Sequence, residues 1–208
     1  MKELAVGIDI GGTHTLFGLV DKLGNCLAQN RLYTKDFDSF SDFVSTLSRR
    51  IKSLEIPNQR NYKVIGIGVG APNADYKNQT IENASNLSWE GILPLGNLLR
   101  HNFDLPIKVT NDANASAMAE MIYGGAVGMK NFMVLTLGTG LGSGIVVNNE
   151  IVYGHSGFAG ELGHIIARPD GRQCGCGRYG CLETYVSATG IKRTVSKLLA
   201  KYSFKSEL

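Results

Sequence analysis

The sequence lacks any apolar run near the ~20 residues that a helix needs to span a bilayer, and no signal-peptide core follows Met1-Lys2-Glu3. Strong charge of either sign is also absent: the formal net charge is +3 over 208 residues, and the basic residues are scattered. A binder of nucleic acid or of anionic membranes would show a clustered basic patch. We therefore expect a cytoplasmic protein with neither of these partners.

Two common nucleotide-binding motifs are missing as well. No Walker-type segment ending in Gly-Lys-Ser or Gly-Lys-Thr occurs. The glycine run 138–144 has the wrong spacing for the dinucleotide fingerprint, and it leads into a strand pattern instead of a helix. These absences exclude the P-loop and Rossmann classes.

Cysteine is scarce, and its distribution is informative. Of four cysteines, Cys174, Cys176 and Cys181 fall within eight residues. In a reducing compartment this spacing indicates metal ligation before it indicates disulfides. Together with His164 they make a complete tetrahedral set with no open position for water, so we predict a structural zinc site. Cys26, alone in a strand pattern, is predicted to be a small core residue.

The residues that are present predict alternating strands and helices. Apolar periodicity predicts strands over 4–10, 14–21 and 26–34 as an antiparallel meander, a helix over 40–54 capped by Asp38 or Ser39, a strand over 63–71, a helix near 93–103, a strand over 106–111 and a helix over 113–123. The strand over 63–71 is apolar on both faces, which indicates an interior position. The stretch 72–89 is expected to be irregular and long enough to be functional.

The pattern then restarts, which suggests a duplicated architecture. Strands are predicted over 132–137 and 145–148, joined by the glycine-rich turn 138–144, and a helix over roughly 190–202. Two hairpins with glycine turns, one at the start of each α/β unit, predict two domains with a cleft between them. We place the domains at 1–124 and 125–208, because Gly124-Gly125 closes the preceding helix.

Two glycine turns are candidates for phosphate contact. In Gly138-Thr139-Gly140 no large side chain shields the backbone amides, and the Thr139 and Ser143 hydroxyls would be additional donors. Gly11-Gly12-Thr13 closely follows Asp9, and one carboxylate beside phosphates suffices to hold hydrated Mg²⁺. A plain conformational interpretation is open for both, since turns favour glycine and an Asp can accept turn amides.

A third candidate is Asn111-Asp112-Ala113-Asn114, where a strand delivers a carboxylate to the start of a helix. An Asp112 that caps the helix would need no other explanation. Alternatively, Asp112 accepts the proton of a sugar hydroxyl as that hydroxyl attacks the γ-phosphate of ATP, a role in which position matters more than basicity. Both roles can hold together.

Taken in order, these motifs resemble the ROK family of repressors and sugar kinases. The resemblance covers the whole chain, and the cysteine stretch is its most specific part. It rests on Asp9-Ile10-Gly11-Gly12-Thr13, Asn111-Asp112-Ala113-Asn114, the run 138–144, Gly160-Glu161-Leu162-Gly163-His164 and the stretch Cys-x-Cys-Gly-x-x-Gly-Cys-x-Glu over 174–183. It implies an α/β fold of the actin-like, ribonuclease H-like ATPase type, with two domains and a sugar bound deep in the cleft.

The resemblance also implies roles for individual residues. Asp112 matches the catalytic base, and the sugar-hydroxyl ligands are Asn111, Asp112, Glu161, His164 and Glu183. Nucleotide phosphates are assigned to Asp9, Gly11, Gly12, Thr13, Gly138, Thr139 and Gly140, with Mg²⁺ accompanying ATP. One ring nitrogen of His164 is expected to bind zinc while the other faces the sugar. A homodimer is expected, because the family is commonly dimeric.

Two features depart from the family pattern. His14 stands where the family often has lysine. Family kinases also continue well beyond 208 residues, so we expect a truncated chain with an incomplete second domain, in which the sugar and phosphate sites are present and the adenine site is absent.

The leading functional prediction is an ATP-dependent hexose kinase that phosphorylates the primary hydroxyl of a sugar, with glucose favoured. The alternatives are a kinase for an N-acetylhexosamine or another hexose, and a sugar-binding fragment without catalysis. A sugar-responsive repressor is not expected, since it would need a helix-turn-helix before the first strand. Substrate choice is assigned to the stretch 72–89, with Asn73, Ser85 and Asn86 as contributors.

Overall fold

A five-stranded sheet organises the first unit of the computed structural model, which describes residues 1–56 and 61–202. The strand order is β3-β2-β1-β4-β8; β1, β2 and β3 pair antiparallel, whereas β4 and β8 run parallel to β1. The strands span Lys2–Ile10 (β1), His14–Asp21 (β2), Cys26–Tyr33 (β3), Tyr62–Ala71 (β4) and Ile107–Asn111 (β8). The predicted meander and the interior place of the fourth strand are confirmed. The carboxyl ends of β1, β4 and β8 meet at one edge.

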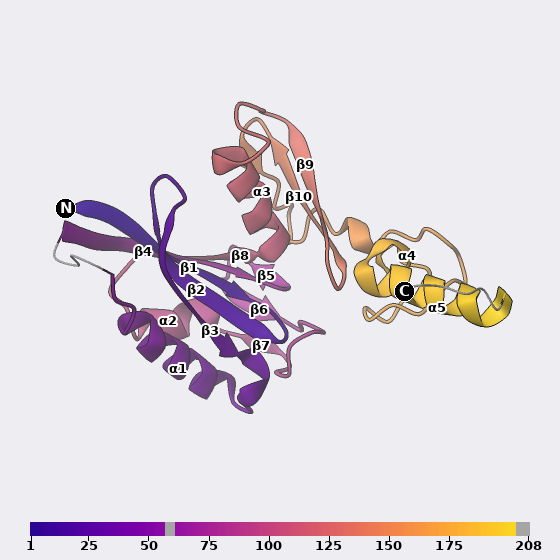
Figure 1. Cartoon of the computed structure of the whole chain (residues 1–208), viewed down its shortest axis with the longest axis horizontal. Coiled ribbons are helices and arrows are strands. Elements are labelled where there is room, and N and C mark those ends of the chain that lie inside the picture. The colour runs from indigo at the N-terminus through magenta and orange to yellow at the C-terminus, as the bar shows by residue number, and fades with distance from the viewer. Residues whose placement is uncertain (57–60, 203–208) are drawn as a thin grey trace.

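Helices α1 (Phe40–Lys52) and α2 (Leu95–Arg100) lie side by side against this sheet (Figure 1). The helix α1 begins after Ser39, whose side chain accepts a hydrogen bond from the Asp42 amide at 3.4 Å. Its buried residues recur at three- and four-residue steps: Phe40, Phe43, Val44, Leu47 and Ile51. They join one core with the alternating inward residues of β1: Leu4, Val6, Ile8 and Ile10. Because strand side chains alternate, Asp9 points to the other face.

Two predictions for the first unit are wrong. The stretch 72–89 is not irregular throughout, because β5 (Ala74–Asp75) and β6 (Thr80–Glu82) form a small antiparallel sheet with β7 (Ile92–Leu93). Strands of two or three residues carry no periodic signal that a sequence could show. Cys26 is exposed instead of buried, because β3 is an edge strand with few buried residues.

The second unit pairs helix α3 with a three-stranded antiparallel sheet (Figure 1). The helix spans Asp112–Tyr123, and the strands span Phe132–Leu137 (β9), Leu141–Val147 (β10) and Glu150–Ile151 (β11). Since α3 contacts β4 and β8 as well as β9 and β10, the division into 1–124 and 125–208 stays a prediction.

The start of β10 corrects the predicted strand over 145–148. The strand begins at Leu141, inside the predicted turn, so Gly142 and Gly144 are strand residues. A Cβ at Gly144 would lie 2.6 Å from the Ala117 Cβ of α3. These glycines therefore serve the close packing of helix on sheet, and the turn itself consists of Gly138, Thr139 and Gly140, hereafter the 138–140 turn.

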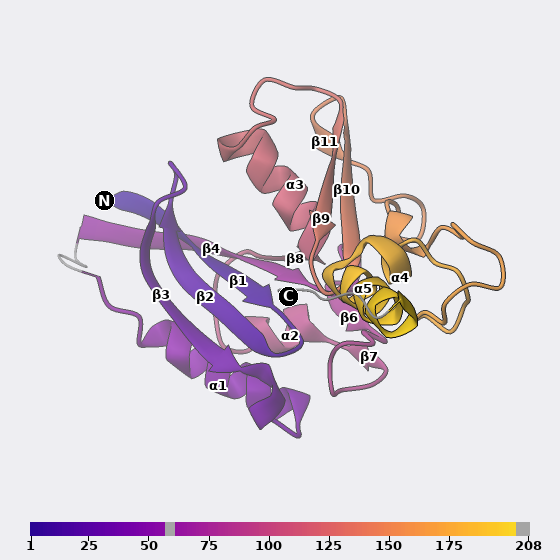
Figure 2. The same ribbon diagram turned by 45° about the vertical axis from the view of Figure 1, so that its right-hand side comes forward.

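The remaining chain is a loop region closed by two helices. A 3₁₀ turn, η3 (Leu162–His164), precedes a loop over 165–182 that holds the three clustered cysteines, hereafter the cysteine loop. Helices α4 (Glu183–Val186) and α5 (Ala188–Tyr202) follow and lie side by side in both ribbon views (Figures 1 and 2). The cysteine loop thus sits between η3 and the paired helices.

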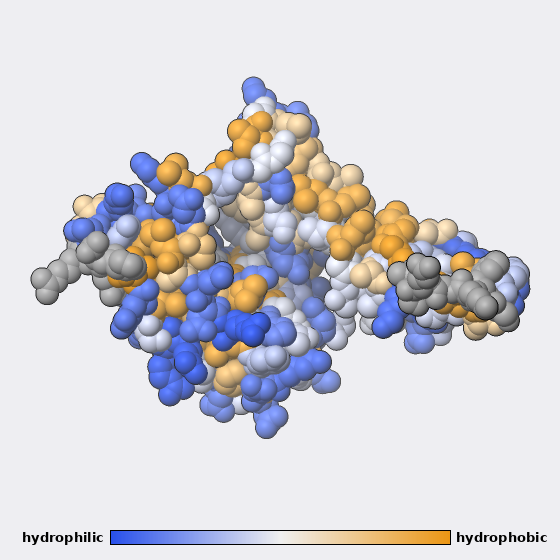
Figure 3. Space-filling view, in the orientation of Figure 1, coloured by the Kyte–Doolittle hydropathy of each residue, from blue (hydrophilic) through white to orange (hydrophobic). Residues whose placement is uncertain are grey.

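One face of the second sheet is open. Met133, Leu135 and Leu137 of β9 are exposed, and Figure 3 shows apolar atoms gathered on the second unit beside the C-terminal helices. Helix α3 packs against this sheet. The residues of β9 that alternate with the exposed ones, Phe132, Val134 and Thr136, are half-buried. Within residues 1–56 and 61–202, no helix has the length and apolar character required to cross a membrane.

Candidate functional site

A cleft of about 950 Å³ lies between the two units. Its walls come from segments far apart in the sequence, and it opens at the edge where β1, β4 and β8 end, the place where open α/β sheets bind ligands. The predicted site residues in its lining are Asp9, Gly11, Gly12, Asn111, Asp112, Gly138, Thr139, Gly140, Glu161, Cys174 and Glu183. The topology therefore brings most of the predicted residues into one place.

At the start of α3, the helix is capped by Asn111, which leaves Asp112 available for the role of proton acceptor. Asn111 is the N-cap, and its Oδ1 accepts hydrogen bonds from the amides of Ala113 (2.8 Å) and Asn114 (3.4 Å). Asp112 follows as the first helical residue, and its Oδ1 also accepts from the Ala113 amide at 2.8 Å. Because Asn111 caps the helix, the exposed Asp112 carboxylate retains acceptor capacity for a ligand in the cleft.

The turn after β1 forms the neighbouring wall. The Gly11 amide donates to the His14 carbonyl at 2.9 Å, and a Cβ at Gly12 would collide with the Asn86 carbonyl oxygen. Gly12 is therefore required for the close approach of the segment around Asn86. Thr13 is not in the cleft lining; its side chain is exposed, and its carbonyl accepts from the Thr34 amide at 2.9 Å.

The 138–140 turn is held from two sides. Its own bond runs from the Gly138 amide to the Gly140 carbonyl at 3.1 Å, and Glu183 Oε2 accepts from the Leu141 amide at 3.4 Å. The prediction that the Ser143 hydroxyl donates to phosphate is wrong, because Ser143 is buried and its hydroxyl donates to the Gly160 carbonyl. Thr139 alone of the two hydroxyls remains a candidate donor.

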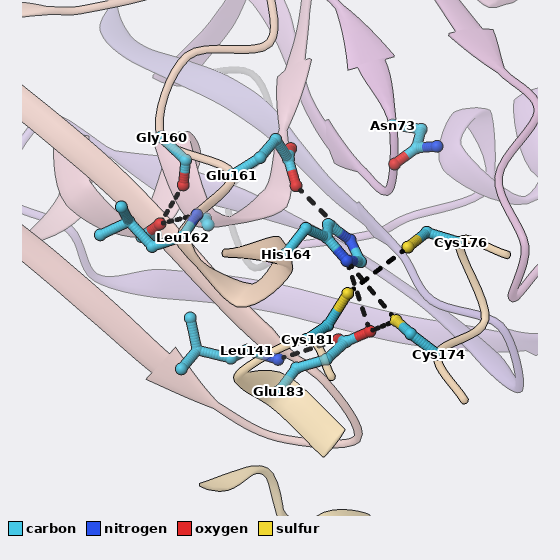
Figure 4. A network of polar contacts seen from close by, with 12 residues as sticks. Asn73, Leu141, Gly160, Glu161, Leu162, His164, Cys174, Cys176, Cys181 and Glu183 are labelled. Carbon is cyan, nitrogen blue, oxygen red and sulfur yellow. Dashed lines mark hydrogen bonds and ion pairs between the residues drawn. The ribbon is translucent and has the colours of Figure 1, made fainter. Parts of the chain in front are cut away.

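Four side chains converge at the cysteine loop (Figure 4). The ligand atoms of His164, Cys174, Cys176 and Cys181 all lie within 4.8 Å of one another. The Cys176 and Cys181 sulfurs are 3.7 Å apart, and the Cys174 sulfur is 3.6 Å from His164 Nδ1. Tetrahedral ligands at the usual Zn–S length would be about 3.8 Å apart. The cluster can therefore hold a tetrahedral metal ion.

The thiols of this cluster differ in acidity. Burial opposes ionisation of Cys176, but hydrogen bonds from Arg178 and from the other two thiols lower its pKa to about 6. Burial raises the pKa of the Cys174 and Cys181 thiols. A bound cation is what would stabilise all three as thiolates, as metal ligation requires.

His164 connects this cluster to the acidic wall of the cleft. Its Nδ1 faces the sulfurs and lies 3.7 Å from Glu183 Oε1, whereas its Nε2 lies 3.9 Å from Glu161 Oε2 (Figure 4). Glu183 Oε1 also accepts from the Cys174 thiol at 2.8 Å. His164 and Cys174 thus connect the histidine–cysteine cluster to both glutamates.

Acidic groups dominate the electrostatics of the cleft. Loss of hydration raises the pKa of Asp9 above its ordinary value of 3.8, and the charge of Asp112 adds to this rise. Loss of hydration also raises the pKa of Glu161; the His164 imidazole opposes this shift, while the charges of Asp112 and Glu183 add to it. Such a cleft favours hydroxyl donors and cations, and it admits phosphates only with a counter-ion.

Asp9→Asn is expected to stabilise the free protein slightly at neutral pH, by at most about 2 °C in Tm. A carboxyl whose folded-state pKa is raised contributes stability below its unfolded pKa, and this contribution is lost as pH rises through the folded pKa. The difference in Tm between Asp9→Asn and wild type should therefore vanish below pH 3.8 and grow above it. Thermal scans without ligands across this range test the expectation; an equal difference at every pH would contradict it.

Other residues reach the cleft besides the assigned ones. Asn73, Ser85 and Asn86 line it as expected for contributors to specificity, and Figure 4 places Asn73 across from Glu161. Thr189 and Arg193 of α5 also line it, and sequence reasoning missed them. No motif marks them, because they enter the site only through the packing of α5.

The fold and cleft define a class: a two-unit α/β protein with an acidic cleft, glycine turns on its walls and beside it a histidine–cysteine cluster that can hold a metal ion. Within that class, the chain belongs to the ROK family, whose family model matches residues 5–207.

Three similar proteins illustrate the range of this family. The chain is 38% identical over 195 residues to a glucokinase of Halalkalibacterium halodurans, covering 92% of this chain and 59% of the relative. It is 30% identical over 211 residues to the xylose repressor of Bacillus spizizenii, covering 97% of this chain and 52% of the relative. A solved ROK family glucokinase from Streptomyces griseus, in complex with glucose and AMPPNP, superposes with a TM-score of 0.81 at 34% identity, covering 96% of this chain and 62% of that one.

These likenesses establish the fold as that of the actin-like ATPases. The chain spans about three fifths of the length of the glucokinases that it matches.

Proposed function

We propose that the chain carries the sugar-binding and phosphate-binding parts of an ATP-dependent hexose kinase, with glucose as the favoured substrate. The observation that carries the proposal is the grouping of Asp112, Glu161 and Glu183 in one cleft with the 138–140 turn. Glucokinases among the relatives, one of them solved with glucose and AMPPNP, support this substrate class. A cytoplasmic location is part of the same proposal.

Recognition of the sugar follows from the acceptor chemistry of the cleft. Sugar hydroxyls donate hydrogen bonds, and the carboxylates of Asp112, Glu161 and Glu183 accept them. The Asn111 amide nitrogen adds a donor, since only its oxygen is used in capping α3. His164 Nε2 lies on the Glu161 side of the ring and is available to the sugar.

Phosphoryl transfer would depend on position more than on strong base chemistry. Asp112 accepts the proton of the primary hydroxyl as the oxygen attacks the γ-phosphate. Amides of the 138–140 turn and of Gly11 and Gly12 approach the phosphates without intervening side chains. Asp9 would hold the hydrated Mg²⁺ that accompanies ATP, and the charge of this ion would offset the repulsion between the acidic cleft and the phosphates.

The cluster of His164, Cys174, Cys176 and Cys181 suits zinc in the number, type and spacing of its donors. Zinc would supply a tetrahedral anchor for the cysteine loop and no chemistry in the transfer itself. With Nδ1 directed to the sulfurs, the His164 ring has a single orientation, in which Nε2 faces Glu161.

Two alternatives keep support. A kinase for an N-acetylhexosamine or another hexose has the same cleft, and Asn73, Ser85 and Asn86 would decide which substituents fit. Sugar binding without catalysis is favoured by the relation to xylose repressors. Both alternatives share the sugar site, so a test of sugar binding comes before a test of activity.

Thermal stabilisation by a panel of hexoses and N-acetylhexosamines, with and without Mg-ATP, tests the proposal. A sugar at 100 times its Kd should add about 2.7 kcal/mol to the free energy of unfolding. We expect selective stabilisation by one sugar, lost in Glu161→Gln and retained in Glu150→Gln, an exposed glutamate of β11. The absence of a shift with every sugar would count against the assignment of the cleft.

A further inference from the structure

Arg172 stands just before the clustered cysteines and reaches across to two helices. Its Nη1 donates to the carbonyls of Thr184 (2.6 Å) and Gly190 (2.9 Å), and its Nη2 donates to the Thr194 hydroxyl (2.7 Å). The guanidinium also lies over the Tyr185 ring, 4.7 Å from its centre. One half-buried side chain thus ties together α4, α5 and the cysteine loop.

At its backbone, Arg172 belongs to the cysteine loop. Its carbonyl accepts from the Gly180 amide at 2.8 Å, and its amide donates to the Tyr185 hydroxyl at 3.0 Å. The next residue, Gln173, pairs with Tyr179 in an antiparallel bridge. Folding of the loop around an ion therefore places the backbone from which the Arg172 side chain extends.

The first turn of α5 in turn holds the 138–140 turn. The Ala188 amide donates to the Gly138 carbonyl at 2.9 Å, and the Thr189 hydroxyl donates to the Thr139 carbonyl at 2.6 Å. Gly190, whose carbonyl Arg172 binds, lies in the same helical turn and approaches α4 closely: a Cβ there would be 2.8 Å from the Thr184 carbonyl. The placement of α5 therefore sets the placement of the 138–140 turn.

We propose that Arg172 is a positioning residue that couples the folding of the metal-binding cysteine loop to the 138–140 turn. The consequence rests on the proposed function: the loop that orders the sugar side of the cleft also sets the affinity for the phosphoryl donor. A lysine cannot replace Arg172, because it lacks the planar fork that serves three acceptors at once.

The test compares Arg172→Gln and Arg172→Lys with Lys192→Gln, an exposed change on α5 outside the cleft lining. Three quantities are measured: metal per chain, hydrogen–deuterium exchange over 136–142, and the Kd values for Mg-AMPPNP and for the sugar. In both Arg172 variants we expect the metal to be retained. The exchange rate over 136–142 and the Kd for Mg-AMPPNP should each rise about tenfold, as for loss of a charge-assisted hydrogen bond. The sugar Kd should change less than about twofold.

Two results would overturn the proposal. One is exchange over 136–142 equal to that of Lys192→Gln while the metal is retained. The other is loss of metal from both Arg172 variants, since Arg172 would then serve the loop itself. Arg172→Lys keeps the charge and decides the matter where Arg172→Gln does not fold. Hydrogen–deuterium exchange needs no ligand, so it tests the coupling even if the wild-type chain binds neither sugar nor nucleotide. Such a failure to bind would refute only the proposed function.

Discussion

Asp112→Asn is expected to lower sugar phosphorylation about 10²–10⁴-fold while leaving the sugar Kd nearly unchanged. The substitution keeps the size of the side chain and removes the proton acceptor. It leaves the start of α3 intact, because the Asn111 side chain caps that helix by accepting from the Ala113 amide at 2.8 Å. Hexose-dependent release of ADP measures the rate, and thermal stabilisation by the sugar measures binding.

The matched control for this variant is Asp104→Asn, an exposed aspartate outside the cleft lining. Equal rates in Asp112→Asn and in the control would remove Asp112 from the role of base. If the wild-type chain is stabilised by a sugar but releases no ADP, the 208-residue chain is a sugar-binding protein without catalysis. Sugar binding is then the only quantity in which Asp112→Asn can be compared with the wild type.

Cys176→Ser is expected to release the metal ion, weaken sugar binding at least about tenfold and lower Tm by roughly 5 °C or more. The physical reason is that the proposed metal ligands contact the glutamates of the sugar site. The Cys174 thiol donates to Glu183 at 2.8 Å, and His164 Nε2 lies 3.9 Å from Glu161 Oε2. A loop without its ion loses the placement of both glutamates. A strong chelator should produce the same losses in the wild-type protein.

Cys26→Ser is the control, because Cys26 is exposed and lies outside the proposed zinc site. Metal analysis of carefully prepared protein gives the decisive reading. One zinc per chain in the wild type and in Cys26→Ser, with none in Cys176→Ser, is the expected pattern. A wild-type protein without zinc would show that the metal assignment is wrong. Phosphate contacts at the Gly11 and Gly12 amides should be less affected by Cys176→Ser or by the chelator, since these residues directly follow β1.

Long and strongly patterned elements could be predicted from the sequence. The strands β2 and β9 have the predicted bounds, and α1 begins after the expected cap Ser39. The four residues that converge as candidate metal ligands could also be named, because spacing within a short loop is a local property. Predictions failed where an element was too short to show a pattern, as in β5 and β6. They also failed where one residue type suits two structures: the glycines at the start of β10 were predicted as turn residues, but they lie in a strand on which α3 packs closely.

The sequence by itself determined the class of fold, the kinds of groups in the cleft and the composition of the histidine–cysteine cluster, since periodicity and the spacing of these residues are properties of the chain itself. Tertiary structure alone decided which groups face one another. It turned His164 Nδ1 to the sulfurs, used the Ser143 hydroxyl to hold the Gly160 carbonyl, and joined Arg172 to α5. The direction of a side chain depends on packing between distant segments, and no local pattern carries that information.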